Sequence, residues 1–114
     1  MLFKANELVE DKRLNMRGGD GEVTMMQLPV EGKPGKVRMA AYITIPVGAS
    51  IGEHAHVGET ELFYFISGLG EVNDAGEIRA VFPGDILSTG NGASHAVKNI
   101  GDVDLVMAAV IVLD

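Results

Sequence analysis

Two histidines one residue apart, followed closely by a glutamate, constrain this chain more than any other feature. They are His54, His56 and Glu61. Residues i and i+2 of a strand point to the same face, so both imidazoles can meet at one point. After a short turn, the carboxylate of Glu61 can reach that point as well. Two neutral imidazoles and a carboxylate are typical ligands of a transition-metal ion. The remaining histidine, His95, lies further along the chain, and the fold decides whether it joins them.

The composition predicts one ordinary globular domain. A chain of 114 residues can bury a single core but not two. Its 15 glycines favour a fold with many tight turns. The absence of cysteine excludes disulfides and thiolate metal sites, so any metal must bind to nitrogen and oxygen ligands.

Charge and hydropathy limit the partners and the location. The net charge of −7 argues against nucleic acid and against an anionic membrane surface as partners. It does not exclude an anionic ligand, because a bound cation can dominate the local field. The N-terminus lacks the basic region and apolar core of a signal peptide. The apolar run over residues 105–113 is much shorter than the ~20 residues of a membrane-spanning helix. We therefore expect a cytoplasmic protein.

Short strand-like segments alternate with turn signals along most of the chain. The predicted strands cover residues 23–28, 37–45, 61–66, 71–72, 77–81, 86–88, 95–99 and 104–113. Their spacing of about 8–12 residues, without any long helical period, is typical of an all-β sandwich or barrel. Residues 1–21 are expected to form an N-terminal arm, with or without a helical turn, and a glycine-rich loop.

The predicted strand over residues 61–66 has two faces that differ. Glu61 shares one face with Phe63 and Phe65, and the other face carries Leu62, Tyr64 and Ile66. If Glu61 points to a metal inside a barrel, the second face points outward and needs cover. Another segment or a second subunit can supply that cover. Homodimerisation through the sheet is therefore a hypothesis of this sequence.

The histidines and the glutamate also belong to two longer patterns of spacing. The first is Gly48, five residues, His54-x-His56, four residues, Glu61, six residues and Gly68. The second is Gly84, five residues, Gly90-x-Gly92, two residues, His95, three residues and Asn99. Together they resemble the two motifs of the cupin superfamily, in order. Gly90 departs from the second motif, which usually carries proline there; this touches the rigidity of a turn and not the ligands.

The resemblance implies a fold, a site and a cofactor. The fold is a double-stranded β-helix, or jelly-roll barrel, with a short N-terminal arm, and the whole chain forms a single cupin domain whose motifs lie in residues 37–112. The implied metal ligands are His54, His56, Glu61 and His95. They would hold one divalent transition-metal ion, manganese, iron, nickel, cobalt or zinc, and leave coordination positions open for a small molecule.

Neighbouring polar residues have less certain roles. Glu59 could be an additional ligand or part of the turn, whereas Glu53 points away from His54 by strand parity. Asn99 is expected to make a structural turn contact. Oxalate decarboxylases resemble the first motif but carry an arginine at the position of Ile51, which argues against oxalate chemistry here. The basic residues nearest to the predicted cavity are Arg38, Arg79 and Lys98, and strand parity does not show which of them faces it.

An apolar wall is expected around the metal, as in most small-molecule pockets. The predicted lining consists of Phe63, Phe65, Val97 and Met107, with Tyr42 or Met39 from a neighbouring strand. For each of these residues, plain barrel core is the alternative role and the favoured one.

Two functions remain open on these residues. The first is a metal-dependent enzyme acting on a small polar or carboxylate-bearing molecule, for example a decarboxylase, dioxygenase, isomerase or lyase. The alternative is a non-catalytic module that binds a small ligand at the same metal site. A metal-free structural barrel would leave the complete ligand set without a use.

Overall fold

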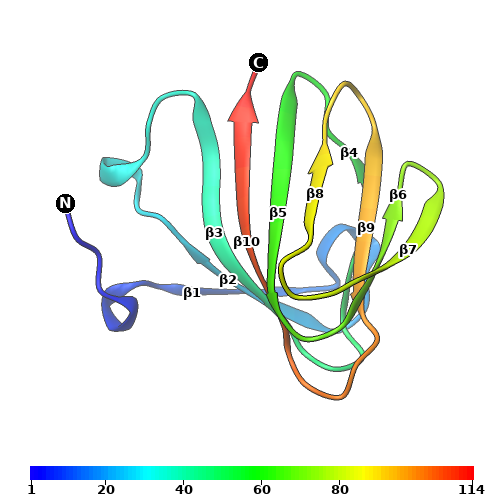
Figure 1. Ribbon diagram of the computed structural model, residues 1–114. Coiled ribbons are helices and arrows are strands. Elements are labelled where there is room, and N and C mark those ends of the chain that lie inside the picture. Colours follow the sequence, from blue (N-terminus) through cyan, green and yellow to red (C-terminus); the bar gives the residue numbers. More distant parts are fainter.

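Ten strands in two antiparallel sheets make up this protein (Figure 1). The structure, a computed structural model, describes all residues from Met1 to Asp114. The larger sheet has the order β1 (Glu10–Leu14), β2 (Glu22–Gln27), β3 (Val37–Ile45), β10 (Leu105–Leu113), β5 (Glu59–Ser67) and β8 (Ile86–Thr89). The smaller has the order β4 (Ser50–Ala55), β9 (Ser94–Asn99), β6 (Gly70–Asp74) and β7 (Glu77–Val81). This arrangement confirms the predicted all-β jelly roll.

The helical content is limited to three 3-10 turns: η1 (Ala5–Glu7), η2 (Met16–Gly18) and η3 (Val30–Gly32). No helix is long and apolar enough to cross a membrane.

The core lies between the two sheets and is set by strand parity. β10 is the central strand of the larger sheet and pairs with both β3 and β5. Its buried side chains alternate with half-buried ones, and the buried set is Leu105, Met107, Ala109 and Ile111. In β5 the same alternation buries Glu61, Phe63 and Phe65. The prediction that these three residues share the inner face is therefore confirmed.

The segment expected as an arm and loop contains a strand. β1 pairs with β2 along its whole length, from Glu10 opposite Met26 to Leu14 opposite Glu22. Local sequence does not reveal this strand, because four of its five residues are charged and show no apolar alternation. Charged side chains are common on edge strands, where they discourage pairing with another chain. Backbone pairing with β2 outweighs the local preference here.

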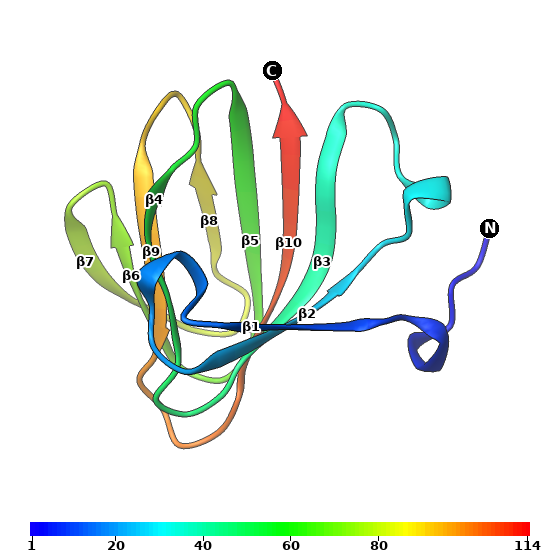
Figure 2. The same ribbon diagram turned by 180° about the vertical axis from the view of Figure 1, so that it is seen from behind.

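The loop after β1 lies directly against β4, the strand that carries His54 (Figure 2). Two hydrogen bonds fasten it: the Ser50 amide donates to the Asp20 carbonyl at 2.9 Å, and the Asp20 amide donates to the Ser50 hydroxyl at 2.8 Å. Next to them the backbones approach so closely that a Cβ on Gly19 would lie 2.2 Å from the Ser50 carbonyl oxygen. Only glycine allows this contact.

Replacing Gly19 tests this contact. We expect Gly19→Ala to lower the free energy of unfolding by about 1–3 kcal/mol, because the new methyl group must push the two backbones apart. Gly35→Ala is the matched control, since nothing lies within 4 Å of the added carbon. Urea denaturation of both variants measures the difference, and equal stabilities would contradict the close approach.

Candidate metal centre

Three elements bring four ligand groups to one point between the sheets. His54 lies near the end of β4, His56 directly follows that strand, Glu61 lies in β5 and His95 lies in β9. His54 and His95 are cross-strand partners, which places their side chains on the same face of the smaller sheet. Glu61 faces them from the larger sheet. One ligand atom of each residue lies within 4.8 Å of the others.

The ligand atoms are the three Nε2 nitrogens and Oε1 of Glu61. Nε2 of His95 lies 3.1 Å from Nε2 of His54 and 3.1 Å from Nε2 of His56. Oε1 of Glu61 lies 3.0 Å from Nε2 of His56 and 3.0 Å from Nε2 of His95. The distance from Oε1 to Nε2 of His54 is longer, 4.0 Å. The predicted residues thus come together as the spacing of the two motifs implied.

The other ring nitrogen of each histidine is held by an oxygen. Nδ1 of His54 donates to the Gly52 carbonyl at 2.8 Å, and Nδ1 of His56 donates to Oε2 of Glu59 at 2.5 Å. Nδ1 of His95 lies 2.8 Å from the Thr89 hydroxyl, which can accept. A neutral imidazole that carries its proton on Nδ1 presents a lone pair at Nε2. These contacts therefore orient three lone pairs toward one centre.

Such a set of atoms fits a cation. Three imidazole nitrogens and a carboxylate oxygen lie within 4.8 Å of one another, and a metal ion at their centre would accept a lone pair from each. Nitrogen with oxygen suits the divalent transition metals. The residues therefore fit the predicted ion.

Glu59 supports the site from behind. Its carboxylate accepts the His56 proton and also forms a bidentate pair with Arg38, with distances of 2.8 and 2.9 Å. The hydrogen bond from Arg38, assisted by the one from His56, lowers the pKa of Glu59 to about 2. Glu59 is thus a permanently ionised acceptor for His56, and the interpretation of Glu59 as a further ligand is replaced by this orienting contact.

Burial and stacking hold the other histidines in place. Burial is the main cause that lowers the pKa of His54, against the opposing hydrogen bond to the Gly52 carbonyl, and this favours the neutral ring that a metal requires. His95 is almost fully buried, and the ring of Phe63 stacks on it with centroids 4.9 Å apart and planes 15° apart. Phe63 therefore packs directly against a ligand.

A cavity of about 310 Å³ opens onto the ligands. His54, His56 and Glu61 line it, whereas His95 lies behind them. Its apolar part is lined by Met16, Met25, Met39, Ile43, Ile51 and Phe63, and its cationic part by Arg13, Arg17 and Arg38. Arg13 and Arg17 were not predicted to line it, because they belong to the segment that was expected to be an arm and loop.

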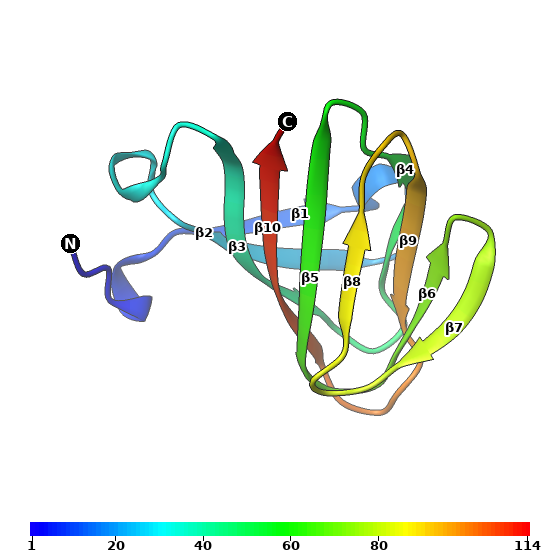
Figure 3. The same ribbon diagram turned by 45° about the horizontal axis from the view of Figure 1, so that its top comes forward.

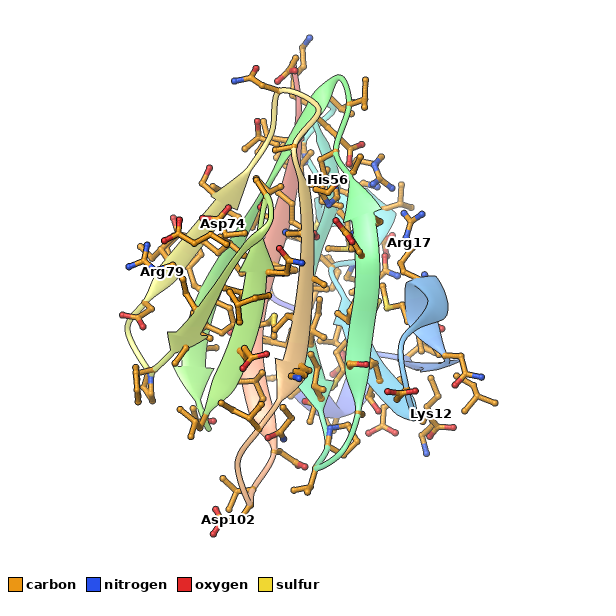
Figure 4. All side chains as sticks on the ribbon, turned by 90° about the vertical axis from the view of Figure 1, so that its right-hand side faces the viewer. Lys12, Arg17, His56, Asp74, Arg79 and Asp102 are labelled. Carbon is orange, nitrogen blue, oxygen red and sulfur yellow. The ribbon has the colours of Figure 1, made fainter.

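Of the three basic residues predicted to lie nearest to the cavity, only Arg38 lines it. Arg38 lines the cavity because it lies at a β-bulge: Met39 pairs with Ile111 and Val37 pairs with Val112, so Arg38 is the extra residue. Arg79, in β7, and Lys98, which pairs with Glu71 at 3.2 Å, are exposed and line other parts of the surface. Figure 4 shows Arg79 on the side of the molecule opposite to Arg17.

The predicted apolar lining is correct in part. Phe63 and Met39 line the cavity, whereas Phe65, Val97 and Met107 are buried in the core and do not reach it. Tyr42 was assigned wrongly: it is 57% exposed on the outer face of the larger sheet. The reason is parity, because Tyr42 and Met39 lie on opposite faces of the same strand and only one of them can face inward.

Two further expectations hold. Glu53 is exposed, as strand parity predicted. Asn99 makes structural contacts: its Nδ2 donates to the carbonyls of Ile45 and Val103, at 2.9 and 2.8 Å, and its Oδ1 accepts from the Gly101 amide at 2.8 Å. These bonds tie β9 to the loop before β10.

Comparison with known proteins agrees with this site and fold. Residues 41–112 match the model of the cupin domain family. The chain belongs to the cupin family. A relative from Thermotoga maritima, named oxalate-binding protein, is 39% identical over 114 residues, which cover 99% of this cupin and 94% of the relative.

Solved structures show the same barrel. The crystal structure of a predicted oxalate decarboxylase from Thermotoga maritima superimposes with a TM-score of 0.94, at 38% identity, and covers 100% of both chains. A cupin 2 conserved barrel domain protein from Salinispora arenicola has a TM-score of 0.70 at 24% identity, over 89% of this cupin and 80% of that chain. The second likeness concerns the fold alone.

The hydrogen bond between Glu59 and His56 can be tested by its effect on metal affinity. We expect Glu59→Gln to weaken binding of a divalent transition metal by about 10–100-fold, because the neutral amide no longer orients and polarises the imidazole as the carboxylate does. Glu53→Gln, at an exposed position of β4, is the control. Competition with a chromophoric chelator gives both affinities, and a Glu59→Gln variant with unchanged affinity would remove this role.

Proposed function

We propose that this cupin binds one divalent transition-metal ion through His54, His56, Glu61 and His95, and that the ion and the neighbouring arginines bind a small carboxylate such as oxalate. The observation that carries the proposal is the convergence of three Nε2 lone pairs and one carboxylate oxygen on a single point. The relative named oxalate-binding protein supports the choice of ligand.

The number of ligands supports a carboxylate on the metal. Four protein ligands would leave a six-coordinate ion with positions to spare, and these could accept oxygens of one small acid or water.

The position of Ile51 no longer argues against a carboxylate ligand. Ile51 does line the cavity, where an arginine would meet a substrate in the oxalate decarboxylases. However, Arg17 lies on the loop that packs against the same stretch of β4 and lines the same cavity. The cationic group that the motif lacks is thus present from another part of the chain.

Binding without turnover is the function that the cavity supports best. Replacement of a carboxylate by hydrogen requires an acid that delivers a proton to carbon. The titratable groups that line the cavity are the three arginines and the three ligands His54, His56 and Glu61. Arginine does not release its proton at neutral pH, and the ligands are committed to the metal. A decarboxylase remains the second candidate, supported by the open coordination positions and by the similar structure described as a predicted oxalate decarboxylase.

Metal-dependent stabilisation by oxalate tests the proposal. We expect oxalate to raise the melting temperature of the metal-loaded protein, by about 2.7 kcal/mol of stability at 100 times the dissociation constant, and to have little effect on the metal-free protein. His56→Ala and the less buried His54→Ala should lose both metal and response, whereas Glu53→Gln should keep them. Oxalate should be recovered without release of formate or CO₂. A response that does not depend on metal would refute the site, and turnover would establish the second candidate.

We also propose that a second copy of this chain covers the outer face of the larger sheet. Tyr42, Ala108, Tyr64 and Ile86 are successive cross-strand partners on β3, β10, β5 and β8. Tyr42, Tyr64 and Ile86 are 57%, 43% and 59% exposed. An apolar groove of about 330 Å³ runs beside this row, lined by ten hydrophobic residues. Isolated proteins rarely leave such a face open to water.

The chemistry of this face fits a second copy as its occupant. The outward positions of β10 and β5 carry no charge, so two copies can meet here without placing like charges directly opposite each other, although each copy carries a net charge of −7. A flat apolar face can pair with itself around a two-fold axis. The outer face of β5, with Leu62, Tyr64 and Ile66, is the part that the sequence analysis expected to be covered.

A charged substitution on this face should dissociate the dimer. We expect the parent protein to sediment as a dimer at micromolar concentration and Tyr64→Arg as a monomer, because the new charges would face each other across the two-fold axis. Ile78→Arg, at a 59% exposed position of the other sheet, should remain dimeric. Analytical ultracentrifugation distinguishes these outcomes, and a monomeric parent would contradict the proposal.

A further inference from the structure

Only one of the three arginines that line the metal cavity is free of an ion pair. Arg13 pairs with Asp11 at 2.8 Å, and Arg38 forms the bidentate pair with Glu59. Arg17 has no ion-pair partner and no hydrogen bond to its side chain. Its guanidinium, with five donors in a planar fork, is therefore available to an anion in the cavity.

The backbone that carries Arg17 is held firmly in place. Met16, the preceding residue, packs against the hydrophobic core. On the other side, Asp20 and Ser50 share the two hydrogen bonds that fasten the loop to β4. The carbonyl oxygen of Arg17 approaches Gly52 so closely that a Cβ there would lie 2.1 Å from it. The position of Arg17 relative to His54 is thus set by packing and by backbone contacts, while its side chain is exposed and unpaired.

The loop also accepts an unfavourable backbone to reach this position. Asn15 and Arg17 both have left-handed conformations, with φ of 52° and 55°. Such a conformation costs about 1 kcal/mol or more for a residue other than glycine, and asparagine tolerates it better than arginine. Figure 3 shows the loop at η2 beside β4, at the side of the barrel. Strain of this kind persists where surrounding contacts hold it, often at functional sites.

Arg17 determines the net charge that the cavity presents to a ligand. Arg13 with Asp11 and Arg38 with Glu59 are neutral pairs. Imidazoles bind a metal as neutral rings, so a bound divalent ion and the Glu61 carboxylate would together carry one positive charge. Arg17 adds a second. A dianion then leaves the cavity neutral, whereas a cavity without Arg17 would match a monoanion.

We propose that Arg17 makes this site selective for small dicarboxylates over monocarboxylates, by binding the ligand oxygens that do not face the metal. This rests on the proposed function, because one end of the ligand is held by the ion at His54, His56, Glu61 and His95. Arg17 then binds the second carboxylate of the ligand and so distinguishes a dicarboxylate from a monocarboxylate. It does so from a loop outside both sequence motifs.

The affinities of a dianion and a monoanion for matched variants test this role. Protein is loaded with Mn²⁺, freed of excess metal, and titrated calorimetrically with oxalate and with acetate. We expect Arg17→Gln to weaken oxalate binding by about 10–100-fold and acetate binding by less than about threefold. Arg17→Lys, which keeps the charge without the fork, should lie between parent and Arg17→Gln for oxalate. Arg79→Gln, at an exposed arginine on the opposite side of the molecule, is the control for a general change of charge.

Each outcome separates this inference from the proposed function. Metal content measured after the titration must stay unchanged in Arg17→Gln, which shows that the variant lost affinity for the ligand and not the ion. If Arg17→Gln binds oxalate as tightly as the parent, or loses oxalate and acetate by the same factor, Arg17 does not select dicarboxylates. If the metal-loaded parent binds no oxalate, the proposed function fails and this inference fails with it.

Discussion

Three hydrogen bonds at the Nδ1 atoms of the ligand histidines are the interactions on which the rest of this site depends. Burial of four ligand groups in an apolar barrel is costly unless their polar atoms are satisfied. The Gly52 carbonyl, the Glu59 carboxylate and the Thr89 hydroxyl satisfy Nδ1 of His54, His56 and His95, respectively. The Nε2 atom of each ring is then available to coordinate an ion. A barrel with the same histidines but without these acceptors could present its rings in the wrong tautomer.

The protein is acidic overall, but its cavity is cationic, because carboxylates pair with only two of the three arginines that line it. Glu59 neutralises Arg38 and at the same time polarises His56, so one carboxylate serves both the wall and the metal centre. Asp11 neutralises Arg13 in the same way. Arg17 alone is left without a partner. If the proposed ion is bound, the ion and Arg17 together would dominate the local field at the cavity, although the chain carries a net charge of −7.

Sequence spacing was sufficient for the ligands but not for the wall of the cavity. The ligand positions follow from strand parity and from motif spacing, both of which are local. Tyr42 was placed wrongly because the inner face of its strand was not settled. Arg38 was named as a candidate, but strand parity did not show that it faces the cavity, because a bulge changes parity at that point. Arg17 depends on contacts between the N-terminal segment and β4, which no local pattern encodes. The departure at Gly90 has a physical reason too: a Cβ there would lie 2.4 Å from the Thr60 hydroxyl oxygen.

Gly52 connects the two halves of the proposed recognition. Its carbonyl oxygen accepts Nδ1–H of His54 and so orients a metal ligand. Its missing side chain leaves the space that the carbonyl of Arg17 occupies. Gly52 therefore contacts both the loop that carries Arg17 and the side chain of His54. A shift of that loop would also disturb the strand that carries His54. Ile51 is compatible with a carboxylate ligand for this reason. An arginine at position 51 would reach the cavity from β4 itself, whereas here Arg17 reaches the same cavity from a loop whose backbone is tethered to β4.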